Sequence, residues 1–415
     1  MGVAPNLLFV FIFFYPFVMS VVWMMGALLF FWRREHRTAD ALPELRRTPM
    51  VSILVPCYNE RAVLAETLVA LREIAYPNYE VLVLNDASTD NTLDVVRAAM
   101  DSDERIRIVN LPVRRGKAHA LNAGVFASRG EILVTLDADA VIHPDAVHYM
   151  VAHFVNTGGE RVGAVTGSPR VRNRATLLGK IQVVEYGSII GLIKRAQRVL
   201  GKLMTVSGVL AAFRKRAILE CGFWDEDMIT DDIAISWKLQ RHAWDIRYEP
   251  RALCWMWVPE KLRGLWRQRM RWSQGGVEVL IRNISVWKRW KQRRLIPIYL
   301  EETVSIVWSY LWLVSLMLLI VEGLHGSVPW NMIRTGGTWL GLMSLCQSVV
   351  ALFLERRYEP PRFMYYYFYA IWYPALYWAI GAFVVVIATP RAVLRMLRRR
   401  TTYATWHSPD RGMSS

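Results

Sequence analysis

The sequence has 415 residues, of which 53% are hydrophobic, with a mean hydropathy of +0.20 and a formal net charge of +16. This high hydrophobic content predicts that part of the chain lies in lipid. Much of the positive charge flanks apolar segments, which favours an anionic lipid surface as a partner and argues against nucleic acid. The four cysteines show no CxxC spacing and no neighbouring histidine cluster, so we expect reduced thiols and neither a zinc site nor a disulfide framework.

Residues 7–32 form an almost unbroken apolar run. The run exceeds the roughly 20 residues that span a bilayer, and it has neither a basic start nor a small-residue cleavage site. We therefore expect a permanent transmembrane anchor over residues 1–32. The arginines after it place the charged linker 33–50, and the domain that follows, in the cytoplasm.

Residues 51–260 alternate short apolar runs with amphipathic stretches. This alternation predicts an α/β domain with a mostly parallel sheet, whose ligands bind at the carboxyl ends of the strands. The expected strands are residues 51–55, 81–84, 106–109, 132–136, 162–165 and 245–248. The expected helices are residues 62–74, 91–100 and 117–128, and an amphipathic stretch follows at 177–198.

The remainder of the chain is expected to meet the membrane. Residues 261–295 contain a Trp- and Arg-rich stretch, 262–282, that is typical of a helix in the membrane interface. A transmembrane bundle is expected over residues 296–390, followed by a basic tail, 391–415. Its apolar segments are residues 298–321, 339–354 and 363–388.

Three single crossings would leave the basic tail outside, against the positive-inside rule. Either residues 363–377 lie at the interface or re-enter the membrane, or the rule is broken here.

Two carboxylates, Asp137 and Asp139, end the apolar run 131–140. In a strand, residues two apart face the same side, so both acids can face one site. Hard oxygen ligands suit Mg²⁺ or Mn²⁺, which in turn binds a diphosphate. Taken alone, so short a pair is more often two surface acids in a loop.

Two further motifs lie later in the chain. Asp231 and Asp232 stand at the start of an expected helix, 233–242, where they complement the helix dipole or belong to an N-cap. Gln268, Arg271 and Trp272 lie within five residues. The alternative for these three is a membrane-surface helix with snorkelling side chains.

In this order, the motifs resemble those of the processive, membrane-embedded family 2 glycosyltransferases, which include the cellulose, chitin and hyaluronan synthases. The resemblance is closest to the bacterial poly-β-1,6-N-acetylglucosamine synthases and covers nearly the whole chain. The segments that carry it are residues 14–20, 166–172, 179–182, 188–195, 206–208, 251–255, 271–276 and 408–412.

The resemblance implies a GT-A-type fold and a set of donor-site roles. Pro56, Tyr58 and Glu60 would frame the uridine, and Asp86 would accept a hydrogen bond from uracil. Lys117 would supply a compensating charge near the nucleotide. By the same resemblance, Asp137 would face the nucleotide sugar and Asp139 would hold the metal on the diphosphate.

The resemblance also implies acceptor-side roles in an inverting reaction. Asp232 would be the general base, beside Asp231, which replaces the Glu usual in the family. Gln268, Arg271 and Trp272 would close over the site, and Ser207 and Gly208 would shape its acceptor side. Two further departures are Ala87, where many relatives have Gly, and a single anchor before the domain, where close relatives have two.

The function implied is polymerisation of N-acetylglucosamine from UDP-N-acetylglucosamine, with export through the bacterial inner membrane for a biofilm matrix. A small membrane partner subunit is implied as well. The aromatic residues 365–369 and Trp372 would line the export path or form an interfacial belt. Synthesis of chitin, hyaluronan or cellulose, or a non-catalytic nucleotide-binding scaffold, are the alternatives.

Overall fold

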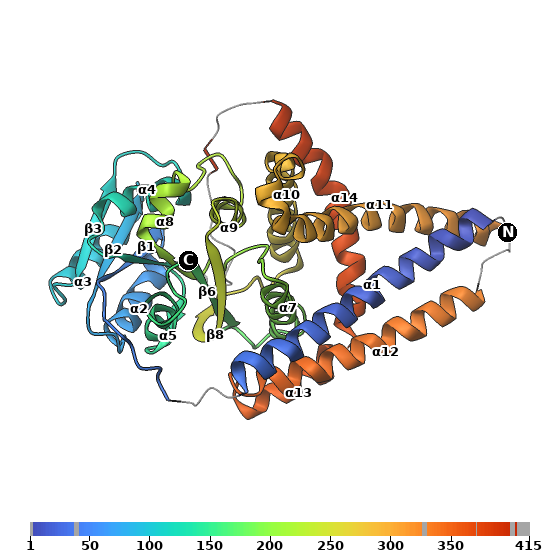
Figure 1. Ribbon diagram of the computed structural model, residues 1–415, viewed down its shortest axis with the longest axis horizontal. Coiled ribbons are helices and arrows are strands. Elements are labelled where there is room, and N and C mark those ends of the chain that lie inside the picture. The colour runs from blue at the N-terminus through green and yellow to red at the C-terminus, as the bar shows by residue number, and fades with distance from the viewer. Residues whose placement is uncertain (1–2, 37–40, 326–329, 371, 399–402, 405–415) are drawn as a thin grey trace.

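The computed structural model describes residues 3–36, 41–325, 330–370, 372–398 and 403–404, and an eight-stranded sheet lies at the centre of its α/β domain (Figure 1). The strand order is β3-β2-β1-β4-β7-β6-β8-β5. The strands are β1 (Val51–Cys57), β2 (Tyr79–Asp86), β3 (Ile106–Leu111), β4 (Ile132–Leu136), β5 (Val141–Ile142), β6 (Val162–Val171), β7 (Leu210–Arg214) and β8 (Asp245–Met256). All six predicted strands are present.

Strands β1 to β4 pair in parallel, as do β6 and β8, which confirms the mostly parallel sheet. The sequence did not predict β7, which pairs antiparallel with both β4 and β6. Its short run, Leu210–Arg214, directly follows a glycine-containing loop and carries no alternation of polar and apolar residues. As a result β7 joins the two parallel halves of the sheet.

Helices cover both faces of the sheet because its strands are apolar on both sides. In β1, Val51, Ile53 and Val55 belong to one buried cluster, whereas Leu54 belongs to another. The first face is covered by α2 (Arg61–Arg72), α3 (Thr92–Met100) and α5 (Ala146–Val155). The second is covered by α4 (Lys117–Ala127), α8 (Lys215–Cys221) and α9 (Asp231–Arg241).

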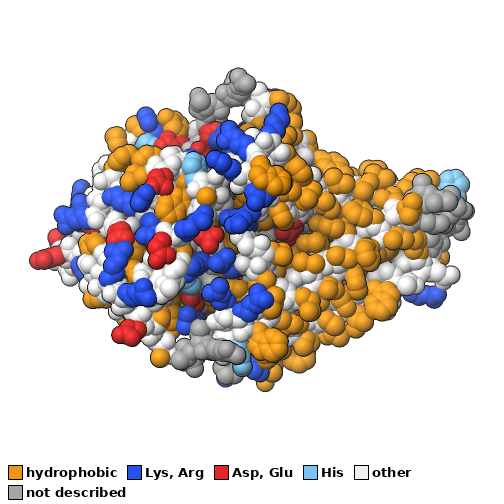
Figure 2. All heavy atoms as spheres, in the orientation of Figure 1, with side chains coloured by type: hydrophobic (Ala, Val, Ile, Leu, Met, Phe, Trp, Pro, Cys, Tyr) orange, Lys and Arg blue, Asp and Glu red, His pale blue; other side chains and the backbone are white. Residues whose placement is uncertain are grey.

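Four helices are long and apolar enough to cross a membrane: Leu7–Glu35, Trp290–Leu324, Trp330–Glu355 and Leu376–Leu397. They lie in α1 (Val3–Phe30) with its π-helical end, in α11 (Ile296–Leu324), in α12 (Trp330–Glu355) and in α14 (Tyr373–Leu397). Hydrophobic side chains cover the surface on the side of Figure 2 where α1, α11 and α12 lie. The expected segment 363–388 was wrong in extent, because α13 (Met364–Ala370) and α14 are separate helices and α14 runs past residue 390.

Helix α14 lies across α11 and along α10 (Leu262–Arg282), the helix expected at 262–282 (Figure 1). Near its first turn, the Tyr373 hydroxyl donates to Glu185 Oε2 over 2.9 Å. Near its last turn, Arg395 donates to Glu278 over 2.6 Å and to the carbonyl of Asp227 over 2.7 Å. Both ends of α14 therefore contact segments that lead from the α/β domain.

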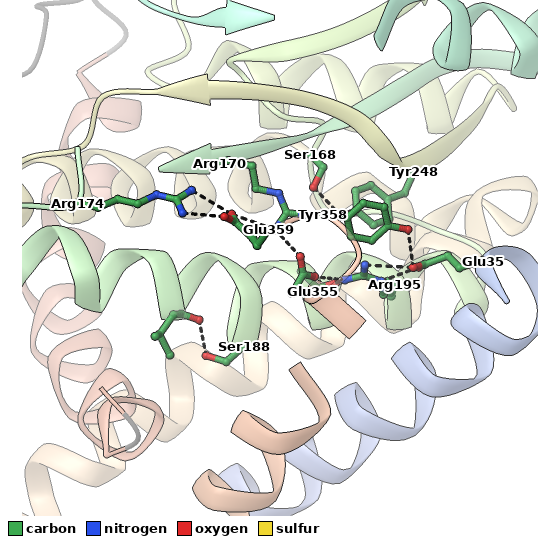
Figure 3. Close-up of polar contacts among 12 residues, drawn as sticks. Glu35, Ser168, Arg170, Arg174, Ser188, Arg195, Tyr248, Glu355, Tyr358 and Glu359 are labelled. Atoms are coloured by element: carbon green, nitrogen blue, oxygen red, sulfur yellow. Dashed lines mark hydrogen bonds and ion pairs between the residues drawn. The ribbon is translucent and has the colours of Figure 1, made fainter. Parts of the chain in front are cut away.

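A buried ion network joins the α/β domain to α1 and α12 (Figure 3). Arg195, on α7 (Leu192–Leu200), donates to Glu35 at the end of α1 over 2.7 Å and to Glu355 at the end of α12 over 2.6 Å. The other members, Arg170, Arg174 and Glu359, continue the network from β6 to the segment after α12. Three arginines and three glutamates balance one another there.

Part of the predicted basic tail lies outside the described residues. Residues 399–402 and 405–415, which include the matching segment 408–412, lie outside them. Residues 403 and 404 lie against the α/β domain, where the Ala404 amide donates to the carbonyl of Glu226 over 2.9 Å.

Candidate active site

A narrow pocket lies at the carboxyl ends of β1, β2 and β4. This is the edge at which a parallel sheet collects the residues that follow its strands. Its lining residues are Pro56, Cys57, Tyr58, Asp86, Gly116, Lys117, Ala120 and Asp137. The structure thus brings together five of the seven residues expected at the donor site.

Tyr58 and Asp86 hold the loop before α4 against this pocket. The guanidinium of Arg114 lies over the Tyr58 ring, 3.6 Å from its centroid. The Asp86 carboxylate accepts the backbone amides of Arg115 over 2.9 Å and of Gly116 over 2.7 Å. Each Asp86 oxygen keeps a second lone pair, so this carboxylate can still accept a hydrogen bond from a base. Arg114, whose ring contact comes from packing between distant segments, was not among the predicted site residues.

Ala87, directly after β2, has a φ of +56°. This left-handed region is favourable for glycine and costs other residues free energy, because their β-carbon crowds the backbone. The turn therefore holds Ala87 in a conformation that suits glycine better.

Lys117 connects the pocket with the loop before β7. Its Nζ donates to Oδ1 of Asp137 over 2.5 Å and to the carbonyl of Gly208 over 2.8 Å. Burial opposes the charge on this amine, but the carboxylates of Asp137, Asp231 and Asp232 together raise the pKa of Lys117 above its usual value. The lysine is therefore a fixed cation among three acids.

Asp137 and Asp139 lie in a turn after β4, because that strand ends at Leu136. The alternation of side chains along a strand therefore does not bring these two acids to one face. Both acids nevertheless lie near the buried Cys254 thiol, because burial and then their charges raise the pKa of that thiol. Asp139 is 8% exposed, and it does not line the narrow pocket. Glu60, at 1% exposed, does not line the pocket either.

The donor chemistry near Asp139 fits a metal that the substrate helps to bind. Among the described residues, no group of three or more His, Cys, Asp or Glu side chains could hold an ion by itself. Mg²⁺ usually takes one or two carboxylates and completes its coordination with water and substrate phosphates. Asp139 supplies such a carboxylate two residues after Asp137, which lines the narrow pocket.

Asp231 and Asp232 form the first turn of α9, and Thr230 is the residue before it. Burial and the neighbouring Asp231 raise the pKa of Asp232 to about 6, against the opposing effect of Arg271 and Lys117. A carboxylate with a pKa close to neutral is suited to accept a proton during a reaction. Asp232 is the acid in this site with the properties of a general base.

The loop before β7 presents Ser207 and Gly208 to Asp232. A β-carbon built on Gly208 would lie 3.1 Å from Asp232 Oδ2, so the carboxylate and the loop backbone are in contact. The Ser207 amide donates to Thr166 Oγ1 over 2.7 Å, and buried Lys194 donates to the same oxygen over 3.2 Å. Lys194 was not a predicted site residue, because its link to the loop passes through a side chain on β6.

Helix α10 carries Gln268, Arg271 and Trp272 over the start of α9. The two helices are in close contact, since a β-carbon on Gly275 would lie 2.2 Å from Thr230 Oγ1. The Arg269 guanidinium lies 4.5 Å from the Trp272 ring centroid.

Arg269 also donates to Glu185 Oε2 over 2.8 Å, which orients this end of the helix. The buried Oε1 of Gln268 has no hydrogen-bond partner among the described residues. The motif therefore places the Arg271 charge near Asp232 and leaves a buried polar atom of Gln268 without a hydrogen bond among the described residues.

Of the aromatic residues expected along an export path, Tyr367 is buried and four are exposed. The side chains of Tyr365, Phe368, Tyr369 and Trp372 are between 46% and 80% exposed. Inside the helical part, the Trp23 and Trp378 rings stack at 5.5 Å instead. The exposed group fits the alternative of an interfacial belt.

Comparison with known proteins agrees with this geometry. Residues 49–275 match the family described as "Glycosyltransferase like family 2". The poly-beta-1,6-N-acetyl-D-glucosamine synthase of Staphylococcus epidermidis strain RP62A is 41% identical over 412 residues, which cover 97% of this chain and 98% of the relative. That of Staphylococcus aureus strain COL is 39% identical over the same shares.

The fold also resembles a solved structure. A mannosyltransferase from Pyrobaculum calidifontis, in complex with GDP-Man and Mn²⁺, superposes with a TM-score of 0.60 at 24% identity. The match covers 83% of this chain and 98% of the mannosyltransferase. It confirms the predicted glycosyltransferase fold of the α/β domain.

Proposed function

Because the chain belongs to the glycosyltransferase-like family 2, we propose that it polymerises N-acetylglucosamine from UDP-N-acetylglucosamine into poly-β-1,6-N-acetylglucosamine. The chain is a glycosyltransferase, and its full-length similarity to the staphylococcal synthases is the observation that carries the polymer assignment. The shared length includes the membrane helices as well as the catalytic domain.

The donor would bind at the carboxyl edge of the sheet. Pro56 and Tyr58 would contact the uridine, with Glu60 supporting their loop, and Asp86 would accept from the uracil. Lys117 would neutralise negative charge between the nucleotide and Asp137, which would face the sugar. These roles rest on the pocket that five of these six residues line.

Asp139 would hold the Mg²⁺ or Mn²⁺ that accompanies the donor diphosphate. When bound, such an ion stabilises negative charge on the leaving nucleoside diphosphate, so no general acid is needed on that side. Arg271 would add a second cation on the acceptor side.

The reaction would be a single displacement with inversion. The oxygen of the acceptor 6-hydroxyl forms a bond to the anomeric carbon while the bond from that carbon to the diphosphate oxygen breaks. The nucleoside diphosphate leaves with the electron pair, and the hydroxyl proton passes to Asp232. Burial, together with Asp231, keeps the pKa of Asp232 high enough for this transfer.

The acceptor chain would lie between the loop Ser207–Gly208 and helix α10. Trp272 would stack on its terminal sugar, and Gln268 would bind a sugar hydroxyl through its free oxygen. The polymer would then leave through a multi-pass bundle in the bacterial inner membrane, with the catalytic domain in the cytoplasm. A small membrane partner subunit would complete the synthase.

Incorporation of labelled N-acetylglucosamine from its UDP donor by purified membranes tests the proposal. We expect polymer that a β-1,6-specific hexosaminidase digests, and none with EDTA or with Asp232→Asn. Asp94→Asn, an exposed acid on α3, is the matched control and should keep full activity. Incorporation from UDP-glucose or from two alternating UDP-sugars would overturn the polymer assignment. No transfer from any donor, with intact nucleotide binding, would overturn catalysis.

A further inference from the structure

A strongly basic pocket lies between the α/β domain and the start of α11. Its volume is about 420 Å³, and its charged lining is five cations and one acid. The cations are Arg161, Lys202, Lys291, Arg293 and Arg294, and the acid is Asp245. We call this cavity the basic pocket.

The positive charge continues beyond the basic pocket toward the end of α1. A neighbouring cavity of about 200 Å³ is lined by Arg33, Arg34 and Arg198. Arg198 and Arg294 both repel the charge on Lys202, and Arg34 repels that on Arg198. The cations of the two cavities therefore act on one another as one group.

This group has too few negative charges. Burial and neighbouring cations lower the pKa of Arg198, Lys202 and Arg247 together. The carboxylate of Asp245 favours the charged forms of these three side chains. It lies 3.8 Å from Lys202, which is longer than a hydrogen bond. The ion network of Figure 3, a short distance along α7, pairs each of its arginines with a glutamate. Here five cations line one pocket with a single acid, Asp245.

Hydrogen-bond donors are left over in the same place. Arg247 lines a further cavity, which it shares with Arg34, Arg198, Glu35 and Glu249, and its buried Nε has no partner among the described residues. The Arg198 guanidinium has no hydrogen bond to any described side chain or carbonyl. Arg161 and Arg247 donate instead to backbone carbonyls, which carry no net charge. Unpaired guanidinium donors in a concave site are suited to phosphate oxygens.

The position of the basic pocket indicates where such phosphates come from. Arg33 and Arg34 end the first apolar helix, and Lys291–Arg294 directly precede α11. Both groups therefore lie where membrane helices leave the bilayer, at the level of the lipid headgroups. Basic pockets between membrane helices at this level bind phospholipid headgroups.

We propose that the basic pocket, with Arg198 beside it, binds a ligand bearing two phosphates, supplied by the headgroup of an acidic phospholipid such as cardiolipin. A soluble diphosphate has the same binding chemistry. The site is separate from the donor pocket, and its occupancy does not depend on the polymer that the enzyme makes.

Lipid retention on the detergent-purified full chain, measured by native mass spectrometry, tests this site. We expect cardiolipin to remain bound in preference to phosphatidylcholine. Arg198→Gln and Lys202→Gln should each weaken its binding about fivefold, which is the loss expected for one cation near a lipid surface. Arg198→Lys, which keeps the charge, should lose less, and Arg97→Gln, on exposed α3, should lose nothing.

Inorganic pyrophosphate distinguishes the two sources of phosphate. If pyrophosphate binds and Arg198→Gln weakens it while cardiolipin is not retained, the site is confirmed with a soluble ligand. Cardiolipin retention that is equal in Arg198→Gln, Lys202→Gln and Arg97→Gln would overturn the proposal. Thermal unfolding of each variant in phosphatidylcholine separates lost binding from lost folding.

Discussion

The backbone of Gly208 lies directly against the carboxylate of Asp232, since a β-carbon on the glycine would be 3.1 Å from Oδ2. The same glycine accepts a hydrogen bond from Lys117 through its carbonyl. This residue thus sets the distance between Asp232 and the Lys117 amine, which also pairs with Asp137. Its lack of a side chain is part of the active-site geometry.

Gly208→Ala should therefore reduce activity without unfolding the protein. The Asp232 side chain can move away from the added methyl group, but it then loses its alignment with the acceptor. A misplacement on this scale costs about tenfold to a hundredfold in rate. Initial rates in membranes measure the loss. Gly276→Ala, at a helical glycine with open space around it, is the control and should keep its activity. Equal activity in both variants would show that the contact is unimportant.

The pKa of Asp232, about 6, predicts the acid limb of the pH–rate profile. The base must be ionised to accept a proton, so the rate should fall as the pH drops through about 6. Arg271→Gln removes a cation that lowers this pKa, and the acid limb should move to higher pH. The profile of kcat/KM for the wild type and for Arg271→Gln provides the measurement. An acid limb that stays in place would assign the titration to another group.

Because its pKa is raised in the folded state, the ionised Asp232 destabilises the folded protein at neutral pH. Because the folded pKa is raised above the unfolded value near 3.9, stability is lost as the pH rises from about 4 to 6. Asp232→Asn should therefore unfold at a higher temperature at pH 7. Its free energy of unfolding should exceed that of the wild type by at most about 3 kcal/mol. At pH 3.5 the two proteins should be equally stable. A lower melting temperature for Asp232→Asn at pH 7 would contradict this account.

Ala87→Gly should stabilise the turn after β2. The residue has a φ of +56°, and a β-carbon in this region costs about 1 kcal/mol. Glycine relieves that strain, while its greater freedom in the unfolded chain offsets part of the gain. Ala98→Gly, at an exposed position in α3, provides the comparison and should destabilise by about 1 kcal/mol. Thermal unfolding of both variants measures the effect, and a loss at Ala87 equal to that at Ala98 would argue against strain.

Arg195→Leu should strongly destabilise the contact between the catalytic domain and the membrane helices. It would remove the ion pairs that buried Glu35 and Glu355 make with Arg195, at a cost of about 3–5 kcal/mol, although Glu355 keeps its pair with Arg170. Arg216→Leu removes an exposed pair and should change stability by less than about 1 kcal/mol. Limited proteolysis and thermal unfolding of both variants measure the difference. Similar stability of the two would show that the network contributes little.

The end of the chain should lie on the same side of the membrane as the catalytic domain. Arg395 and Ala404 contact Asp227, Glu278 and Glu226 of that domain or its adjoining helix. A membrane-impermeant maleimide should therefore label Leu324→Cys in intact spheroplasts, but Tyr403→Cys only after permeabilisation. Labelling of Tyr403→Cys in intact spheroplasts would place the tail outside. In this arrangement α14 does not cross the membrane. The basic tail then stays in the cytoplasm, as the positive-inside rule requires.

The sequence by itself determined the elements and most of the site. Strand and helix periods placed six strands and a parallel sheet, and a parallel sheet brings the residues that follow its strands to one edge. Tyr58, Asp86 and Asp137 could therefore be expected together, since each follows a strand whose direction was predicted, whereas Lys117 was expected only from the family resemblance. Apolar length alone located the four helices that are long enough to cross a membrane, although it set the limits of the last one wrongly.

Tertiary structure decided the contacts between residues that are distant in the chain. The positive φ of Ala87, the contact of Gly208 with Asp232, and the network from Glu35 through Arg195 to Glu355 depend on how separate elements pack. The course of α14 along α10 was decided in the same way. The apolar run in the sequence predicts how long a helix is, but packing against neighbouring helices sets its orientation. The basic pocket has the same origin, since cations from three distant segments are brought together only by folding.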